Sequence, residues 1–179
     1  MNHTRQFIRK TAVIGMLLAV QVVAGLYISI RLPIATIGFT FLPLSITAML
    51  YGPLWGSAAA FLGDFLIAAL GPYGYFPPMA TTALLSGFLY GVFLYRKPIT
   101  TKRVLLCVLV ESLLCSVLLQ TYWITLLSGK GYLALMPVRL FQNLITAPVS
   151  VICIRMAAGP VLKLAKQYGI VEAPAVSKA

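Results

Sequence analysis

The segment TAVIGMLLAVQVVAGLYISI, residues 11–30, decides the fold class, because none of its residues is charged. About 20 predominantly apolar residues suffice for one helix to cross a bilayer. The sequence that follows is almost as apolar, and Asp64 is the only charged residue between Arg31 and Arg96. This pattern predicts an all-α integral membrane protein.

The composition of the whole chain supports the same class. Of its 179 residues, 60% are hydrophobic and only 9% are charged, and the mean hydropathy is +0.95. In ordinary soluble domains charged residues supply about a quarter of the sequence. A soluble enzyme, a disulfide-stapled secreted domain and a nucleic-acid-binding module are therefore excluded. The three cysteines lie in apolar stretches without metal-site spacing, so we expect neither a metal nor a cofactor.

Hydropathy and chain-breaking residues together predict six transmembrane helices. We expect them at residues 7–30, 36–51, 54–70, 79–95, 104–127 and 137–164. Proline lacks a backbone donor and restricts the residue before it, so Gly52-Pro53 and Gly71-Pro72 indicate helix boundaries. Residues 1–168 are predicted to form a single six-helix domain, and residues 169–179 a cytoplasmic tail.

The positive charges are concentrated in three places: before the first predicted span, between the fourth and fifth, and at the end of the sixth. These residues are Arg5, Arg9, Lys10, Arg96, Lys97, Lys102, Arg103, Arg155, Lys163, Lys166 and Lys178. Six crossings put all three groups on one side, and cytoplasmic loops of membrane proteins collect Lys and Arg. Both termini are therefore predicted to be cytoplasmic.

Nothing in the sequence predicts catalysis. It has no GxxxxGK[ST] phosphate-binding loop, its only histidine is His3, and no nucleophile–base or carboxylate pair is evident. Functional chemistry is then expected from polar residues inside the spans. A charged group there costs about 2.5–3.5 kcal/mol and is read as functional by default.

The sixth span carries the longest polar stripe. Arg139, Gln142, Asn143 and Thr146 follow the i, i+3, i+4, i+7 spacing of a single helix face. Because this span begins outside, the stripe is predicted to lie in its outer half and to bind a ligand. An interhelical hydrogen-bond network is the structural alternative.

Two other spans contribute isolated candidates. Gln120 and Trp123 fall in the outer half of the fifth span, and Asp64 falls near the middle of the third. Asp64 is expected either to accept hydrogen bonds from a ligand or to pair with Arg139. Glu111, about seven residues from the predicted inner end of the fifth span, is a weaker candidate, with a structural or partner contact favoured for it.

Two loops are expected to complete an outward-facing cavity. Tyr75 and Phe76 lie in an aromatic, proline-rich loop that is read as a lid, with ordinary interfacial anchoring as the alternative. Arg31 lies on the same side as Arg139. Two cations, amides, a carboxylate and flat rings suit a small anionic molecule with an aromatic heterocycle, because Arg binds carboxylates in a bidentate manner.

A second surface is predicted on the first span. Ala12, Gly15 and Ala19 recur at i, i+3 and i+7, and small residues let another helix approach closely within lipid. This stripe is therefore a candidate seam for a membrane partner.

Several short strings resemble one known family. They are Phe41-Leu42-Pro43-Leu44, Tyr51-Gly52-Pro53-Leu54-Trp55-Gly56, Gly63-Asp64, Phe76-Pro77 and Arg139-Leu140-Phe141-Gln142-Asn143-Leu144 followed by Pro148. Over nearly the whole chain the sequence resembles the folate-family substrate-binding (S) components of energy-coupling factor (ECF) vitamin transporters. The resemblance implies a six-helix protein of a bacterial cell membrane that captures a vitamin, most specifically folate or a reduced folate.

The resemblance also implies partners and residue roles. A transmembrane coupling subunit would dock on the first span at Gly15 and Ala19, with glycine replacing one family alanine. Two cytoplasmic ATPase subunits would supply the energy that this chain cannot. By the same likeness, Arg139 and Asn143 would hold polar groups of folate, and Asp64 would read the donors of its pterin ring.

Other functions stay open on the sequence alone. The same fold could bind pantothenate, a thiamine precursor or another small vitamin. A free-standing proton-coupled carrier would use Asp64 or Glu111 as its proton site, although six spans offer little material for two alternating repeats. A membrane assembly factor without a ligand would leave the polar stripes unexplained.

Overall fold

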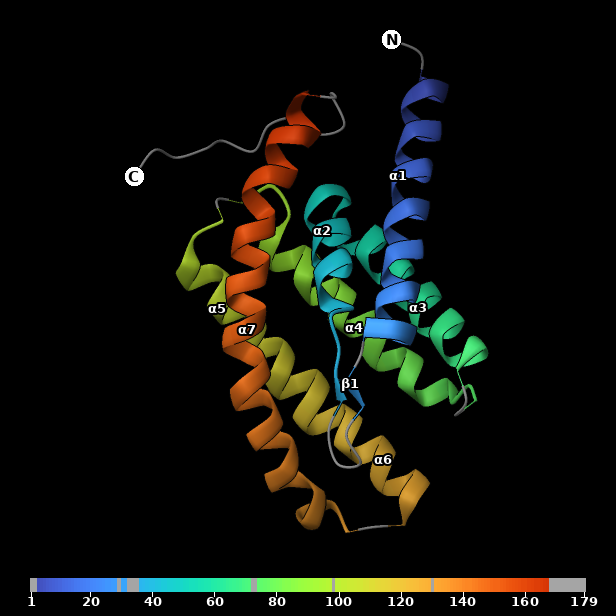
Figure 1. Ribbon diagram of the computed structural model, residues 1–179, viewed down its shortest axis with the longest axis vertical. Helices are drawn as coiled ribbons and strands as arrows, with labels where there is room; N and C mark the ends of the chain where they lie inside the picture. Colours follow the sequence, from blue (N-terminus) through green and yellow to red (C-terminus); the bar gives the residue numbers. More distant parts are fainter. Residues whose placement is uncertain are drawn as a thin grey trace.

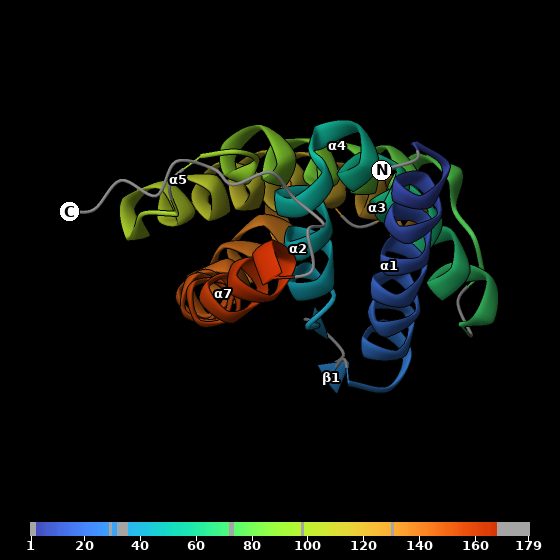
Figure 2. The same ribbon diagram turned by 90° about the horizontal axis from the view of Figure 1, so that it is seen from above.

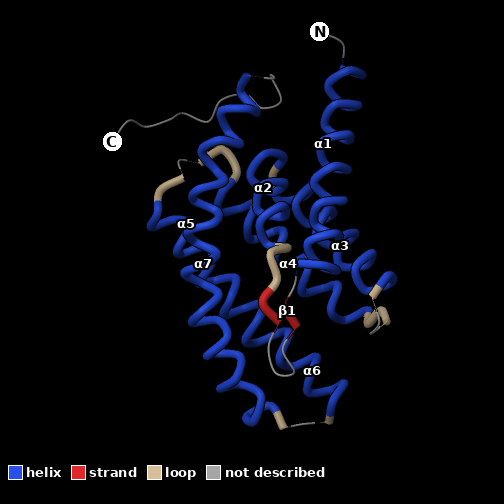
Figure 3. Tube along the Cα trace, in the orientation of Figure 1, coloured by secondary structure: helices blue, strands red, loops and turns tan. Residues whose placement is uncertain are grey.

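The computed structural model describes residues 3–28, 30–31, 36–71, 74–97, 99–129 and 131–167, and nearly all of them are helical (Figures 1 and 3). The elements in chain order are α1 (His3–Val23), η1 (Ala24–Ile28), β1 (Ile30–Arg31), β2 (Thr36–Ile37), α2 (Phe41–Tyr51), α3 (Pro53–Leu70), α4 (Pro77–Leu94), α5 (Thr101–Glu111), η2 (Ser112–Gln120), α6 (Thr121–Ser128) and α7 (Tyr132–Gln167). Here η1 and η2 are π-helical segments, and β1 and β2 form a two-residue antiparallel pair.

Five predicted spans are confirmed as helices long and apolar enough to cross a membrane. They cover Phe7–Ile28, Pro53–Leu70, Pro77–Leu94, Thr101–Leu127 and Leu135–Ala165 of the described chain. The multi-pass membrane class predicted from hydropathy therefore holds, and the predicted bounds agree within a few residues.

The second predicted span, 36–51, is corrected by the structure. Its helix, α2, contains only 11 residues, about 16 Å at 1.5 Å per residue, roughly half of the hydrocarbon thickness. The first two predicted residues, Thr36 and Ile37, are extended and pair with β1. Their β-branched side chains favour such a backbone over helix. The described chain therefore has five long apolar helices and one shorter apolar helix, Phe41–Tyr51, at the place of the second predicted span.

The break between α2 and α3 follows from two neighbouring residues. Gly52 has φ +94°, which a residue with a side chain rarely adopts, and Pro53 occupies the first turn of α3, where its missing donor is not needed. The ring of Tyr95 lies against Gly52, 3.5 Å from where a Cβ would be. The turn therefore brings α3 back beside α2 with almost no loop.

Small residues hold α3 against α4. A Cβ added to Gly87 would clash with the Gly56 carbonyl oxygen, and one added to Gly91 would clash with Pro53. Without those side chains the two backbones come into direct contact, as is typical of helices packed within lipid. The pair α3–α4 is thus the tightest unit of the bundle.

The core lies where α2 meets α4, α5 and α7. Its fully buried members include Ala48, Leu94, Val104 and Cys107, each at most 2% exposed. Seen along the bundle, α2 lies between α1 and α7 (Figure 2). The short helix α2 is therefore packed inside the bundle. Most of the large exposed apolar side chains belong to the longer helices, as expected for helices that face lipid.

The start of α1 and the end of α7 lie at the same end of the molecule (Figure 1). The connection between α6 and α7 lies at the other end, and the β1–β2 pair lies in the same half of the molecule as that connection (Figure 1). The predicted tail, residues 169–179, falls outside the described residues.

Candidate functional site

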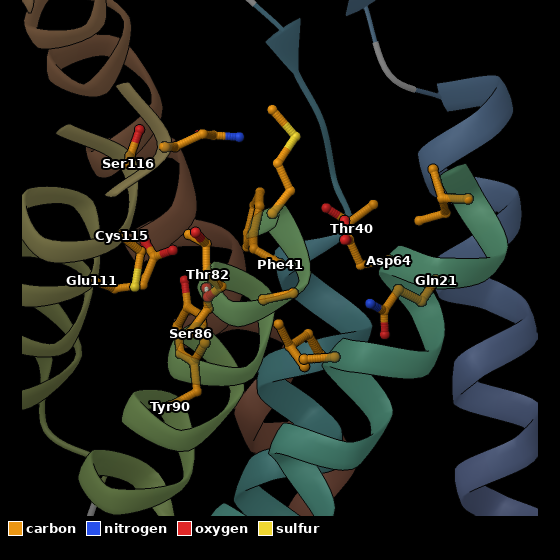
Figure 4. Close-up of a pocket in the computed structure, with 16 residues that line it drawn as sticks. Gln21, Thr40, Phe41, Asp64, Thr82, Ser86, Tyr90, Glu111, Cys115 and Ser116 are labelled. Atoms are coloured by element: carbon orange, nitrogen blue, oxygen red, sulfur yellow. Dashed lines mark hydrogen bonds between the residues drawn. The ribbon is translucent and has the colours of Figure 1, made fainter. Parts of the chain in front are cut away.

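A cavity of about 230 Å³ opens among α1, α2, α3, α4, α5 and η2 (Figure 4). Its wall is built from 16 residues: Gln21, Thr40, Phe41, Leu44, Ala60, Asp64, Ile67, Met79, Thr82, Ala83, Ser86, Tyr90, Glu111, Cys115, Ser116 and Gln120. The wall therefore mixes apolar surface with polar groups that converge from several helices, as small-molecule sites generally do.

The polar residues gather at two ends of this cavity. Figure 4 places Gln21, Thr40 and Asp64 together on one side and Thr82, Ser86, Glu111 and Cys115 on the other, with Phe41 between them. Each end contains one carboxylate and at least one hydroxyl. A ligand in the cavity would thus meet hydrogen-bonding groups at both ends and apolar surface between them.

A close packing contact builds the Asp64 end. A Cβ on Gly63 would overlap the side-chain amide of Gln21. Glycine at this position therefore leaves room for the Gln21 amide, which is only 5% exposed, beside the neighbouring Asp64. In the pair Gly63-Asp64, the glycine thus leaves room for the Gln21 amide and the aspartate brings a carboxyl group to the cavity.

Both carboxylates lie deep in their helices. Asp64 is eleven residues from the start of α3 and Glu111 is ten residues from the start of α5, about 15–16 Å at 1.5 Å per residue and so near the middle of the hydrocarbon layer. Glu111 was predicted to lie nearer the inner end because the predicted span began at residue 104. In the structure the helix begins three residues earlier, at Thr101. The low weight given to Glu111 rested on that boundary.

The charge of the cavity wall is one-sided. Its 16 residues include two carboxylates and no Lys, Arg or His, and no ion pair joins Asp64 or Glu111 to a cation in the described ranges. Burial of an unpaired charge is costly, so such groups inside a membrane are normally functional. The wall is therefore an acceptor-rich surface that suits a ligand carrying N–H donors.

The π-helix η2 shapes one wall of the cavity. In a π-helix backbone bonds run from residue i to i+5, and such segments occur frequently at functional sites. Glu111 and Ser116 are five residues apart, as are Cys115 and Gln120, and all four line the cavity. The π-helical spacing thus places these four side chains on the face that lines the cavity.

The predicted site residues divide into two sets. Asp64 and Gln120 line the cavity. Tyr75 and Phe76 do not, because the ring of Tyr75 packs edge-on against Phe65 of α3, with centroids 5.0 Å apart, and Phe76 precedes the first turn of α4. Arg31 pairs through its backbone with Thr36, and its side chain is outside the described structure.

The predicted polar stripe forms a separate group on α7. Arg139 Nη1 donates to Gln142 Oε1 at 3.3 Å, and the Thr146 hydroxyl donates to the Gln142 carbonyl at 2.8 Å. None of the stripe residues Arg139, Gln142, Asn143 and Thr146 belongs to the cavity wall. The same is true of Trp123 on α6, which packs edge-on against Tyr122.

Two nitrogen atoms of this second group lack partners. The indole Nε1 of Trp123 and the amide Nδ2 of Asn143 are buried and find no hydrogen-bond partner among the residues that the structure covers. Buried donors are normally satisfied, so an unsatisfied pair needs an explanation. The α6–α7 side of the bundle is thus donor-rich, in contrast to the cavity wall.

The small residues of α1 are on its surface. Ala12, Gly15 and Ala19 are all exposed, and a Cβ on Gly15 would meet nothing within 4 Å. The stripe therefore lies on the exposed surface of the described bundle.

Sequence reasoning missed most of the cavity wall. Gln21, Thr40, Thr82, Ser86 and Tyr90 were not singled out. A signal existed for two of them, since Thr82 and Ser86 are polar residues at i and i+4 within an otherwise apolar helix and so share a face. Which neighbouring helix that face meets is a matter of packing, and no pattern within one helix reveals it.

Comparison with known proteins gives consistent results. A family model described as "ECF transporter, substrate-specific component" matches residues 9–158. A folate transporter, FolT, of Clostridium novyi (strain NT) is 34% identical over 77% of this chain and 81% of its own length. FolT of Leuconostoc mesenteroides is 26% identical over 83% of this chain and 81% of its own length.

Solved structures give the same fold. A crystal structure of FolT bound with folic acid matches with a TM-score of 0.76 and 33% identity, over 81% of this chain and 89% of that one. The S-component for biotin from an ECF-type ABC transporter matches with a TM-score of 0.67 over 93% of this chain and 95% of that one; at 17% identity this likeness concerns the fold alone. With the family model covering most of its length, this multi-pass membrane chain belongs to the family of substrate-specific components of ECF transporters.

Proposed function

We propose that this protein captures folate or reduced folates in the membrane for ATP-driven ECF-type uptake. The observation that carries the proposal is a cavity inside a bundle that resembles FolT bound with folic acid along four fifths of the chain. The 34% identity to a curated folate transporter supports the same ligand. The chain acts as a binding component and not as an enzyme.

The two polar regions match the two halves of folate. A pterin ring presents N–H donors, which suit the acceptor-rich wall around Asp64 and Glu111. The glutamate end of folate is anionic and suits the donors Arg139, Trp123 Nε1 and Asn143 Nδ2 on the α6–α7 side. Gln120 lines the cavity at the end of η2, directly before α6, which carries Trp123. Arg31, Tyr75, Phe76 and Gln142 complete the proposed substrate site.

The proposed orientation follows from the cations. Arg9, Lys10, Lys102, Arg155 and Lys163 flank the ends of α1, α5 and α7, and α1 begins where α7 ends (Figure 1). Since cytoplasmic loops collect Lys and Arg, both termini would be cytoplasmic and the cavity would receive its ligand from outside. Residues 1–168 would act as one domain, with 169–179 as a cytoplasmic tail.

The proposed partners are those of an ECF transporter: one transmembrane coupling subunit and two cytoplasmic ATPase subunits. The exposed stripe Ala12, Gly15 and Ala19 supports docking through α1, because its small side chains let another helix come close.

The runner-up is the same fold with another small vitamin as its ligand. The shared fold of the biotin S-component makes this a concrete alternative. The one-sided acceptor wall argues against biotin or pantothenate, since neither has a heterocyclic edge of adjacent donors.

The direct test is a tryptophan-fluorescence titration of purified protein with folate, 5-formyltetrahydrofolate, pantothenate, thiamine and riboflavin. We expect saturable folate binding with a Kd at or below about 1 μM, worth at least about 8 kcal/mol. Trp55, which is 42% exposed and outside the cavity wall, provides the control: the signal should persist in Trp55→Phe. Tight binding of another vitamin, with none of a folate, would refute the proposed ligand.

A further inference from the structure

The end of the cavity between α4 and α5 combines three polar side chains. Figure 4 shows Thr82 and Ser86 of α4 lying toward Glu111 of α5, with Cys115 beside them. This end is closed by buried side chains, since Tyr90 is 2% exposed and Cys115 is 1% exposed. A flat ligand entering the cavity would therefore have one edge against these three polar groups.

Glu111 has acceptor capacity left over at this end. A carboxylate offers about four lone-pair positions, and its side-chain hydrogen bond is with Ser86. The Ser86 hydroxyl has one proton and also lies 3.0 Å from the Thr82 carbonyl oxygen, so it serves one of the two acceptors at a time. No cation lies on the cavity wall, so the carboxylate has acceptor positions left for the donors of a ligand.

The Thr82 hydroxyl gives an independent observation. Thr82 is 9% exposed and lines the cavity, yet its Oγ1 has no hydrogen-bond partner within the described chain. Buried hydroxyls are normally bonded. A ligand that presents an acceptor to Thr82 and donors to Glu111 would satisfy both groups at once.

The 2-amino-4-oxopyrimidine edge of a pterin has this order of groups: a carbonyl oxygen, a ring N–H and an amino group. We propose that Glu111 accepts the adjacent ring N–H and amino donors in a bidentate contact, and that Thr82 donates to the 4-oxo oxygen. Glu111 is then the specificity-determining residue for the pterin head, a role that sequence analysis gave to Asp64. This assignment rests on the proposed function, because it places one part of the proposed ligand.

The assignment also fixes the direction of the ligand. A cavity wall with two carboxylates and no cation disfavours the anionic glutamate end of folate, so we expect that end to lie away from Glu111 and to contact Arg139, as the proposed function requires. Reduction of the pterin alters its other ring, and the edge that Glu111 reads stays the same. Oxidised and reduced folates should therefore depend equally on Glu111.

The test separates the two halves of the ligand. Competition against labelled folate gives Kd values for folate, 6-methylpterin, which lacks the tail, and p-aminobenzoylglutamate, which lacks the pterin. Glu111→Gln keeps the shape and replaces an acceptor by a donor. This variant should raise the Kd values for folate and 6-methylpterin by the same factor, on the order of a hundredfold. The Kd for p-aminobenzoylglutamate should stay unchanged. Thr82→Val should weaken both pterins by about tenfold.

Two controls accompany these variants. Arg139→Ala should weaken the binding of folate and p-aminobenzoylglutamate but leave the binding of 6-methylpterin unchanged. Ser150→Ala removes a buried hydroxyl of α7 away from the cavity wall and should change no Kd. If Glu111→Gln does not fold, as judged by size-exclusion chromatography, Thr82→Val decides the test.

Each outcome has a separate meaning. The assignment is overturned if folded Glu111→Gln binds pterins unchanged, or if the expected loss appears in Asp64→Asn instead. In either case, folate binding by the unmodified protein still supports the proposed function. Absence of folate binding by the unmodified protein overturns the proposed function, and the assignment with it.

Discussion

At the residue scale, the contact between Gly87 and Gly56 determines how closely α4 packs on α3. A methyl group on Gly87 would overlap the Gly56 carbonyl oxygen and lie 2.9 Å from Ala60 Cβ. We expect Gly87→Ala to destabilise the protein by about 1–3 kcal/mol, the usual cost of overpacking, and to lower its melting temperature in detergent. Gly15→Ala is the matched control, because nothing lies within 4 Å of that position. Equal melting temperatures would contradict the close packing.

The candidate site shows which residues a sequence can identify. Asp64 was found because it is the single charge in a long apolar stretch. Glu111 was given too little weight because its depth depends on where α5 begins, and the helix starts three residues before the predicted position, at Thr101. Thr82 and Ser86 were missed because a hydroxyl within an apolar helix becomes informative only when the facing residue is known. Single-helix patterns therefore predict faces, and packing decides what each face meets.

At the element scale, hydropathy predicted the long helices well and α2 poorly. Apolarity measures how readily a segment enters lipid, and it does not separate the extended Thr36–Ile37 from the helix that starts at Phe41. The π-helical form of η2 was equally invisible, since it changes the spacing of contacts without changing composition. The start of α2 and the segment η2 both line the cavity, through Phe41 and through Cys115, Ser116 and Gln120.

The element with the clearest prediction is α1. Gly15→Leu combined with Ala19→Leu would fill the stripe of small residues on its exposed face. We expect an unchanged Kd for folate, because neither residue lines the cavity, and at least a tenfold loss of ATP-driven folate uptake in proteoliposomes that contain the coupling and ATPase subunits. Met16→Leu, on the same helix and 73% exposed, should leave uptake intact. Normal uptake by the double variant would refute docking through α1.

At the scale of the whole molecule, the short α2 leaves the number of crossings to be tested directly. The start of α1 and the end of α7 lie at the same end of the molecule (Figure 1), so the proposed orientation expects α2 with its extended lead to complete a sixth crossing. In the proposed orientation the α4–α5 connection would be cytoplasmic and the α6–α7 connection would lie outside. Thr100 and Gly131, both exposed, lie in these two connections.

Single cysteines at these two positions test the topology. In a background in which Cys107, Cys115 and Cys153 are replaced by alanine, we expect an impermeant maleimide to label Gly131→Cys on intact cells and Thr100→Cys only after lysis. The physical reason is the accumulation of Lys97, Lys102 and Arg103 around Thr100, which the positive-inside rule assigns to the cytoplasm. Retained folate binding verifies that each variant is folded. Labelling of Thr100→Cys on intact cells would place the α4–α5 connection outside and would overturn the proposed orientation.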